Sequence, residues 1–388
     1  MPDSGTEAGM AWGWALAYRE LGYRVIVITQ NAAELDPSDS DWKQAGIQLI
    51  RVGQAAKMRS IPQGSIEYFT ATFRYMQWVA ATRRVIKNLD NLSLVHHVSW
   101  SSVRLPPPTP SQFRGNVIWG PLGGGHRPIF RGLPMRNVVQ ELFRLATFVP
   151  GFLNLIWTRF TRGKRIQALA TNRQTLRILN AAGFRNATLE LADGLSAVPA
   201  KRTAPSSEAT IRMVWLGRLV GSKRPDLAIR VAHELASRGE SVNLKLAGAG
   251  PELDSLQSLV TELTAANYVE LLGRVPHGQV GNLYRQTDLV LFCSMRDSSA
   301  PVALEAAAHG VPTFGLLQSG LGDLFPNSFT FGKPKFTSDI DFVNEIADLI
   351  QNYKTLDSEA QTSISLSAVD FANNQTWGHK LNRILGIS

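Results

Sequence analysis

The sequence holds one cysteine in 388 residues, Cys293, so no disulfide can form within the chain. Cys293 lies in the apolar run DLVLFCS, a pattern typical of a buried strand rather than of a nucleophile. Neither a pair of cysteines nor an HExxH motif is present, so the sequence offers no zinc-type metal site. It also lacks a Gly-x-Ser-x-Gly elbow, which gives no support to a serine hydrolase.

The chain lacks a long apolar run as well. Its start, MPDSGTEAG, is acidic and Gly-rich, unlike a secretory leader. The apolar stretch LATFVPGFLNLIWT has 14 residues and contains Pro150, so it is too short to span a bilayer. With 44% hydrophobic and 18% charged residues, the composition indicates a globular protein, and the length allows two domains.

Acidic residues are scarce in residues 127–165, which contain Glu141 alone against eight cations. Much of the net charge of +9 therefore lies in this segment, beside Phe, Leu and Trp side chains. This combination favours contact with an anionic membrane surface, although a core helix with solvated charges is the alternative. Nucleic acid is not expected as a partner, because the cations are not interleaved with stacking aromatics over a wider surface. The cations are Arg127, Arg131, Arg136, Arg144, Arg159, Arg162, Lys164 and Arg165.

Strand-like and helix-like patterns alternate along the chain, which predicts parallel sheets covered by helices. We expect a first domain over residues 1–200 and a second over residues 201–369, with a helix near 370–388 that returns to the first. Strands are predicted at 24–29, 47–52, 92–98, 116–120, 166–171, 211–217, 242–248, 268–273, 288–294 and 311–316. Helices are predicted at 8–21, 65–88, 136–147, 172–182, 225–239, 251–263 and 301–309.

One strand is missing from this alternation. A doubly wound domain normally opens with a strand that feeds a Gly-rich loop and a helix. Here the Gly-rich loop of residues 4–9 comes first, with no strand before it. We therefore expect a first domain without its opening strand, and an upstream start is the favoured explanation.

Two cations follow the strand predicted at 211–217. Arg218 and Lys223 in GRLVGSK lie where ligands collect in open α/β sheets, and both suit the oxygens of a diphosphate. Gly248, in the turn GAGPE, is expected to let the backbone approach a nucleotide closely.

Two carboxylates follow the strand predicted at 288–294. Glu305 lies in the apolar stretch PVALEAAA, where an unpartnered carboxylate would be costly, so ribose hydroxyls are its expected partners. Asp297 is expected to accept hydrogen bonds from donor-sugar hydroxyls. The loop between them can offer backbone N–H groups to phosphate, through Ser298, Ser299 and Ala300.

The first half adds weaker candidates. Gly123, Gly124 and Gly125 follow a strand and allow a ligand close to the backbone, with His126 next to them. His96 and His97 end another strand and point to opposite sides, and His97 is the favoured cleft-facing one. Gly5 and Thr6, at the entrance of the first helix, could face the diphosphate or sugar.

At these residues the chain resembles the retaining glycosyltransferases of family 4, which have the GT-B fold. The motifs that carry the resemblance are GRLVGSK, LAGAGPE, YVELLGRV and the pair ending in LEAAAHGVP; the family's Glu-x7-Glu has Asp297 as its first acid here. GTEAGMAWGWA, LVHHVSW and IWGPLGGG resemble a subgroup associated with bacterial exopolysaccharide or lipopolysaccharide assembly. The resemblance implies an acceptor domain, a donor domain, a cleft between them, and catalysis without a metal or cofactor.

The sequence thus predicts hexosyl transfer from a UDP-sugar or GDP-sugar to a glycan or lipid-linked acceptor, with Arg218, Lys223, Asp297 and Glu305 in the catalytic site. The expected location is cytoplasmic, at the inner face of the cytoplasmic membrane. Two alternatives stay open. A sugar-nucleotide 2-epimerase shares the fold but needs a general-base carboxylate in the first domain, which the sequence does not reveal. A non-catalytic binding or scaffold protein is the second alternative, and the absence of the opening strand is consistent with it.

Overall fold

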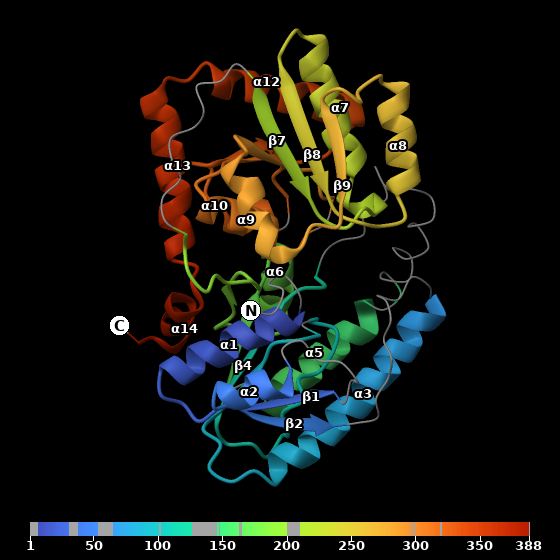
Figure 1. Ribbon diagram of the computed structural model, residues 1–388. Coiled ribbons are helices and arrows are strands. Elements are labelled where there is room, and N and C mark those ends of the chain that lie inside the picture. The colour runs from blue at the N-terminus through green and yellow to red at the C-terminus, as the bar shows by residue number, and fades with distance from the viewer. Residues whose placement is uncertain are drawn as a thin grey trace. The chain divides into compact units, whose positions relative to one another are not determined.

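The computed structural model describes residues 7–30, 38–52, 65–100, 102–125, 146, 148–162, 165–199, 210–295, 297, 299–318 and 320–387. These residues form two compact units (Figure 1). The first contains the described chain up to Asp193 and again from Lys380 onward, and the second contains Gly194–His379.

The first unit is an α/β unit whose described ladders are all parallel. They form two separate sheets, one with the order β1-β2 and one with the order β3-β4-β5-β6. Its strands are β1 (Ile26–Gln30), β2 (Gln48–Val52), β3 (Leu94–His97), β4 (Asn116–Leu122), β5 (Ile166–Ala170) and β6 (Thr188–Leu189). Its helices are α1 (Glu7–Glu20), α2 (Asp39–Gln44), α3 (Ser65–Lys87), α5 (Phe148–Arg162) and α6 (Arg173–Ala181).

The predicted strands of this unit, and its predicted helices at 8–21, 65–88 and 172–182, each have a counterpart in the structure. The prediction does not include α2 and β6, and it differs from the structure in two further places. The helix predicted at 136–147 lies almost entirely outside the described residues. The apolar stretch after it forms α5, whose Leu155 is fully buried against β4 and β5. The β4 sequence NVIWGPL is buried over six of its seven residues, which explains why it reads as a continuous apolar run.

The second unit is built on a parallel sheet of order β12-β11-β10-β7-β8-β9. Its strands are β7 (Ile211–Leu216), β8 (Val242–Ala247), β9 (Val269–Gly273), β10 (Leu289–Phe292), β11 (Thr313–Leu316) and β12 (Thr330–Lys333). Its helical elements are η3 (Gly221–Lys223), α7 (Pro225–Ser237), α8 (Leu253–Glu262), α9 (His277–Arg285), α10 (Pro301–Ala308), α11 (Gly320–Leu324), α12 (Asp339–Lys354) and α13 (Ser358–Asn373). The last helix, α14 (Trp377–Leu385), enters the first unit at Lys380.

The chain reverses its winding direction in the middle of this second sheet. From β7 it proceeds outward through β8 and β9, whereas from β10 it proceeds the other way through β11 and β12. Since crossover connections are right-handed, α7 and α10 must cover opposite faces. The carboxyl ends of β7 and β10 therefore flank a topological switch point, the usual ligand position in open α/β sheets.

The C-terminal region differs from the single helix predicted near 370–388. It forms α13 and α14, which are separated at residues 374–376. At this separation Thr376 forms an isolated parallel β-bridge with Leu195. The next residue, Trp377, packs its ring against Gly194.

Candidate functional site

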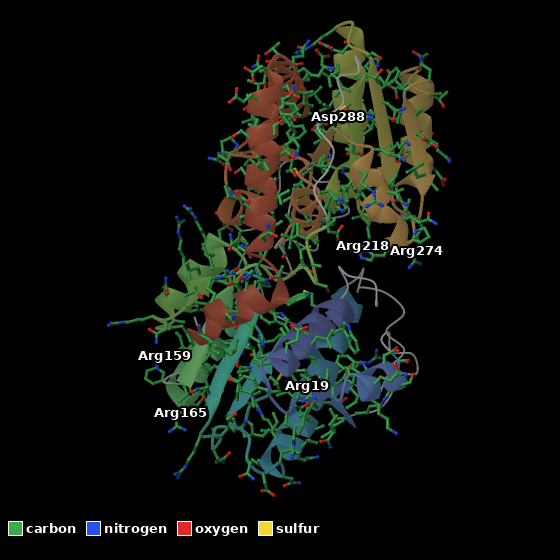
Figure 2. The ribbon with its side chains drawn as sticks, turned by 60° about the vertical axis from the view of Figure 1, so that its left-hand side comes forward. Arg19, Arg159, Arg165, Arg218, Arg274 and Asp288 are labelled. Carbon is green, nitrogen blue, oxygen red and sulfur yellow. The ribbon has the colours of Figure 1, made fainter. Side chains whose placement is uncertain are left out.

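Both predicted cations of the second unit follow β7. Arg218 is exposed directly after the strand, and Lys223 ends the short turn η3 that leads into α7. Figure 2 shows Arg218 at the same end of the unit as Arg274, which directly follows β9. Arg274 is exposed too, so it adds a third cation that the sequence argument did not assign to the site.

The predicted carboxylates follow β10, and the structure brings one of them to a cation. Asp297 forms an ion pair with Lys223, in which both side chains are mostly buried. The Met295 backbone N–H donates to the Ser222 carbonyl at 3.0 Å, so the two loops are also joined through their main chains. The loops after β7 and β10 thus meet at the switch point of the sheet.

Glu305, the second predicted carboxylate, lies on α10, where it is half-buried and has alanines next to it in the sequence. The Tyr284 hydroxyl on α9 donates to Glu305 Oε2 at 3.1 Å. Burial, reinforced by the neighbouring carboxylate, raises the pKa of Tyr284 well above its usual value, so the phenol remains a neutral donor. Nothing in the sequence singled out Tyr284, because 21 residues separate it from Glu305.

Gly248 lies where only glycine fits. A Cβ at this position would be 1.8 Å from the Gly217 carbonyl oxygen, and one at Gly250 would be 2.3 Å from that of Leu219. The turn after β8 therefore packs backbone against backbone on the loop that carries Arg218. Its role in the structure is to hold that loop close to the sheet.

Both helices that enter this region begin in the same unusual way. Arg224 precedes Pro225 at the start of α7, and Ala300 precedes Pro301 at the start of α10. Both residues have a left-handed backbone conformation, with φ of 46° and 47° respectively. Ser299 and Ala300 are buried at the entrance of α10, whereas Ser298 lies outside the described residues.

Arg224 is a site-adjacent residue that the sequence argument missed. Its guanidinium donates to Asp226 and Asp339, both at 2.7 Å, and lies 5.6 Å from the centre of the Phe336 ring. These partners raise the pKa of Arg224 although burial opposes them. Arg224 therefore fixes the start of α7 rather than offering its charge to a ligand.

The described glycines among the first-unit candidates pack closely against neighbouring elements. A Cβ on Gly124 would lie 2.7 Å from Ser102 Oγ, and one on Gly125 would lie 2.6 Å from the Thr175 Cα. The glycines thus allow this strand end to pack on its neighbours, Gly123 through a bridge to Ser102. Gly5, Thr6 and His126 lie outside the described residues.

His97 is placed differently from the expectation. It is 4% exposed, with its ring near those of Tyr75 and Trp78, so the prediction that it faces an open cleft is wrong. Burial, with His96 next to it, lowers the pKa of His97 to about 3. Burial also lowers the pKa of His96 to about 4. The neutral His96 donates from Nε2 to the Gly120 carbonyl at 2.8 Å and accepts the Tyr18 hydroxyl at Nδ1.

Cys293, directly after β10, is buried as the sequence predicts, and this burial raises the pKa of its thiol. Within the described ranges, no group of three or more His, Cys, Asp or Glu residues is placed to hold a metal ion. No helix in the described part of the chain is both long and apolar enough to cross a membrane.

Comparison with known proteins finds a family match in the second half of the chain. Residues 200–363 match the family described as Glycosyl transferases group 1. The phosphatidylinositol N-acetylglucosaminyltransferase GPI3 subunit of Saccharomyces cerevisiae is 28% identical over 156 residues, covering 40% of this chain and 34% of that protein. The match thus spans about a third of that curated relative's length.

Two solved structures resemble the whole chain. HepE of Anabaena, determined with UDP and glucose, has a TM-score of 0.61 at 16% identity and covers 98% of this chain and 96% of its own. WaaG, a glycosyltransferase involved in lipopolysaccharide biosynthesis, has a TM-score of 0.61 at 15% identity, covering 100% and 97%. The chain therefore has the GT-B fold, and the family match is confined to residues 200–363.

Proposed function

We propose that the protein is a retaining glycosyltransferase that moves a hexosyl unit from a UDP-sugar or GDP-sugar to a glycan or lipid-linked acceptor. One observation carries this proposal: Lys223, after β7, pairs with Asp297, after β10, at the switch point of one parallel sheet. The family of residues 200–363 and the UDP and glucose held by HepE support the same reading.

In this proposal Arg218 and Lys223 hold the diphosphate and stabilise the charge that develops as it leaves. Glu305, oriented by Tyr284, accepts hydrogen bonds from the ribose hydroxyls, and Asp297 accepts them from the donor sugar. The ion pair between Lys223 and Asp297 keeps both side chains in place before the donor arrives. Backbone N–H groups at Ser299 and Ala300, at the start of α10, add donors for phosphate oxygens.

The bond between the sugar C1 and the diphosphate oxygen breaks, and a new bond forms from C1 to the acceptor oxygen on the same face. The acceptor's proton passes to the leaving phosphate. We propose that the cations neutralise this leaving group without a metal ion, so transfer should continue in EDTA. Loss of transfer in EDTA, restored by magnesium or manganese, would contradict that part of the proposal.

The acceptor is proposed to belong to bacterial surface polysaccharide assembly at the inner face of the cytoplasmic membrane. The involvement of WaaG in lipopolysaccharide biosynthesis supports this choice. So does α5, whose exposed apolar stripe contains Val149, Leu153, Trp157 and Phe160. Such a stripe beside basic residues suits the surface of an anionic membrane.

The test compares Arg218→Ala and Lys223→Ala with Arg230→Ala, an exposed cation on α7 that serves as the matched control. A thermal-shift screen of UDP-glucose, UDP-N-acetylglucosamine and GDP-mannose first identifies the donor. Each site variant should then lose about 2–4 kcal/mol of transition-state stabilisation, or roughly 30- to 900-fold in kcat/KM. Arg218→Ala should keep the wild-type melting temperature, whereas Lys223→Ala should lower it, because it removes the cation paired with the mostly buried Asp297. Equal donor kinetics in all three variants would refute the assignment.

A further inference from the structure

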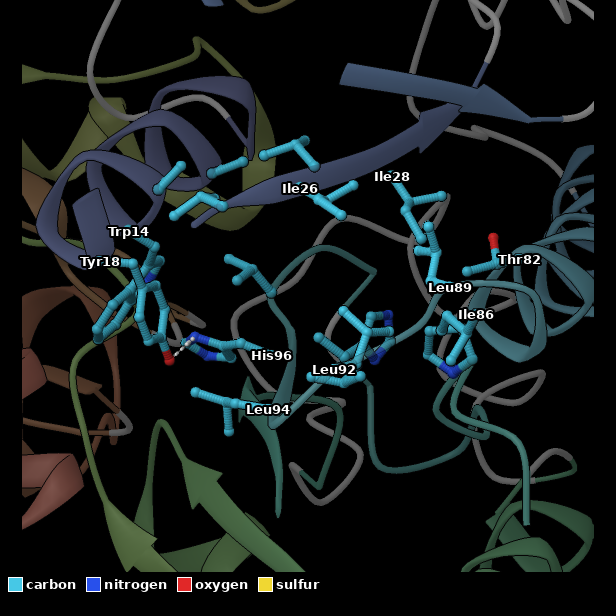
Figure 3. Close-up of a pocket in the computed structure, with 18 of the residues that line it drawn as sticks. Trp14, Tyr18, Ile26, Ile28, Thr82, Ile86, Leu89, Leu92, Leu94 and His96 are labelled. Atoms are coloured by element: carbon cyan, nitrogen blue, oxygen red, sulfur yellow. Dashed lines mark hydrogen bonds between the residues drawn. The ribbon is translucent and has the colours of Figure 1, made fainter. Parts of the chain in front are cut away.

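The first unit contains cavities of two different kinds. A cavity of about 240 Å³ is lined mainly by apolar side chains, among them Ile26, Ile28 and Leu94 (Figure 3). A second cavity is an open groove of about 950 Å³, and no Asp or Glu is among the described residues that line it. We call it the arginine groove, because its lining includes Arg114, Arg159, Arg165 and Arg185.

The arginine groove lies at the amino end of the strands in the larger sheet of this unit. Arg114 lies just before β4, Arg165 directly precedes β5, and Arg185 lies between α6 and β6. These three strands are parallel, so the three arginines share one edge of the sheet. Ligands in open α/β sheets collect at the opposite edge, beyond the carboxyl ends of the strands. The groove is therefore a separate feature, and none of its residues belongs to the second unit.

Two of the four guanidinium groups are held in place by main-chain carbonyls. Arg159 Nε donates to the Gly183 carbonyl at 2.7 Å, and a terminal nitrogen of Arg165 donates to the Arg114 carbonyl. Figure 2 shows Arg159 and Arg165 on the same flank of the unit. A carbonyl orients a guanidinium without neutralising its charge, and each arginine has five N–H donors. Most of the donors of Arg159 and Arg165 therefore remain available to a ligand.

The positive charge of the groove is not compensated within the protein. Among the described residues, no carboxylate lies within ion-pair distance of any of the four arginines. Cations gathered without acidic partners repel one another, and a multiply charged anion placed among them removes this cost.

The wall of the arginine groove also contains a buried hydroxyl without a partner. Thr109 lines the groove and is 1% exposed, and its Oγ1 has no hydrogen-bond partner within the described residues. Pro108 and Pro110 flank Thr109 and restrict its backbone. Buried hydroxyls are normally hydrogen-bonded, because an unpaired one costs free energy. An oxygen-rich ligand in the groove would offer this hydroxyl an acceptor.

We propose that the arginine groove binds the phosphate group of a phosphate monoester, which carries a charge of about −2 at neutral pH. Guanidinium groups match phosphate oxygens in a two-pronged geometry, and an anion of this charge suits several arginines at once. Two sources offer the same chemistry, namely a soluble phosphate ester and the headgroup of a lipid. Phe160, which is 84% exposed on α5, also lines the groove, so both sources are tested. The inference does not rest on the proposed glycosyl transfer.

The test uses the double variant Arg114→Gln and Arg185→Gln, in which the Arg114 carbonyl that holds Arg165 is kept. Both side chains are exposed, so the melting temperature should not change. The matched control is Arg74→Gln and Arg84→Gln, which removes two exposed cations of α3 that do not line the groove. Binding of glycerol 3-phosphate is measured by calorimetry, with glycerol as the probe that lacks the phosphate. The groove variant should bind glycerol 3-phosphate at least about tenfold more weakly than the wild type, whereas the control should match the wild type.

Hydrogen exchange distinguishes this site from the proposed donor site. Glycerol 3-phosphate should slow exchange in wild-type peptides covering residues 109–117 and 182–188, and leave peptides covering residues 217–224 unchanged. Slower exchange at 217–224 alone would overturn the present inference and leave the proposed function intact.

Flotation with vesicles distinguishes the two sources. Phosphatidylcholine vesicles that contain phosphatidic acid, a phosphate monoester, are compared with vesicles that contain phosphatidylserine at the same surface charge. A preference for phosphatidic acid that the groove variant loses would support a lipid headgroup, and binding of glycerol 3-phosphate without such a preference would support a soluble ester. The proposal is overturned if the wild type binds neither glycerol 3-phosphate nor phosphatidic acid preferentially, or if the groove variant and the control bind them equally well.

Discussion

Helix α5 allows a quantitative prediction about membrane binding. One face is in the core through Gly151, Leu155 and Thr158. The opposite stripe is apolar yet exposed: Leu153 is 61% exposed and Phe160 is 84% exposed. Contiguous exposed apolar side chains usually mark a binding surface. Arg159 and Arg165, shown in Figure 2, are the two cations of the basic segment 127–165 whose side chains the structure describes.

The perturbation is the double variant Leu153→Ser and Phe160→Ser. Fully burying a large apolar side chain is worth about 1.5–3 kcal/mol. Scaled by exposures of 61% and 84%, the two residues contribute about 1–2 and about 1.3–2.5 kcal/mol if a membrane buries them completely. Their sum, about 2–4 kcal/mol, corresponds to a roughly 30- to 1,000-fold loss of partitioning, which is an upper limit for partial insertion.

The assay is flotation with vesicles of phosphatidylcholine alone and with 30% phosphatidylserine added, at low and high salt. Binding should require the anionic lipid and weaken with salt, since a basic residue near the surface contributes about 1 kcal/mol. The matched control is Ile340→Ser, which removes a 74% exposed isoleucine from α12 in the other unit. Binding by the double variant equal to that of the wild type, or an equal loss in the Ile340 control, would refute the reasoning.

Two further predictions concern stability. Burial lowers the pKa of Lys380 from 10.5 to about 8. Between these pH values the unfolded chain holds a proton on Lys380 that the folded chain has released. The free energy of unfolding should therefore rise by about 3 kcal/mol as the pH rises from 8 to 10.5. Lys380→Met should lack this rise in urea unfolding at pH 7.5 to 10.5, and a pH-independent difference between the two proteins would contradict it. Gly248→Ala should lower the melting temperature of the second unit, because its Cβ would lie 1.8 Å from the Gly217 carbonyl oxygen. The control is Gly239→Ala, whose Cβ would have no atom within 4 Å, so the melting temperature should fall less.

The sequence predicts the second unit well for a physical reason. Its central strand β10 is buried at all four residues, so it reads as an unbroken apolar run, a pattern typical of a strand in a parallel sheet. The loops after β7 and β10 then fall on the same edge, which is why the sequence places Arg218, Lys223 and Asp297 near one another. Their roles towards a ligand stay predictions. The pairing of Lys223 with Asp297 is a consequence of the fold that spacing alone does not contain.

Other features depend on contacts too distant in sequence to be predicted. Arg224 reads as one more surface cation, yet Asp339, 115 residues away, completes its ion pairs. Lys380 reads as an exposed helical lysine, yet it is fully buried and donates to the carbonyls of Leu191 and Asp193, both at 2.6 Å. The misplacement of His97 has a similar origin, because alternation predicts opposite sides for neighbouring residues but not which side is the core.

The starts of α7 and α10 link this local structure to the site. Non-glycine residues rarely adopt left-handed backbone, and a following proline restricts them further. Five non-glycine residues of the described chain have a positive φ. Two of them, Arg224 and Ala300, occupy equivalent positions, because each directly precedes the proline that begins a helix after a central strand. A conformation of this kind costs about 1–3 kcal/mol and persists where its surroundings enforce it. At Arg224 the enforcing contacts are the two carboxylates, and at Ala300 they include complete burial. Because β7 and β10 are neighbouring parallel strands, the helices that follow them begin at the same edge of the sheet. The diphosphate site that we propose between the two loops depends on this arrangement.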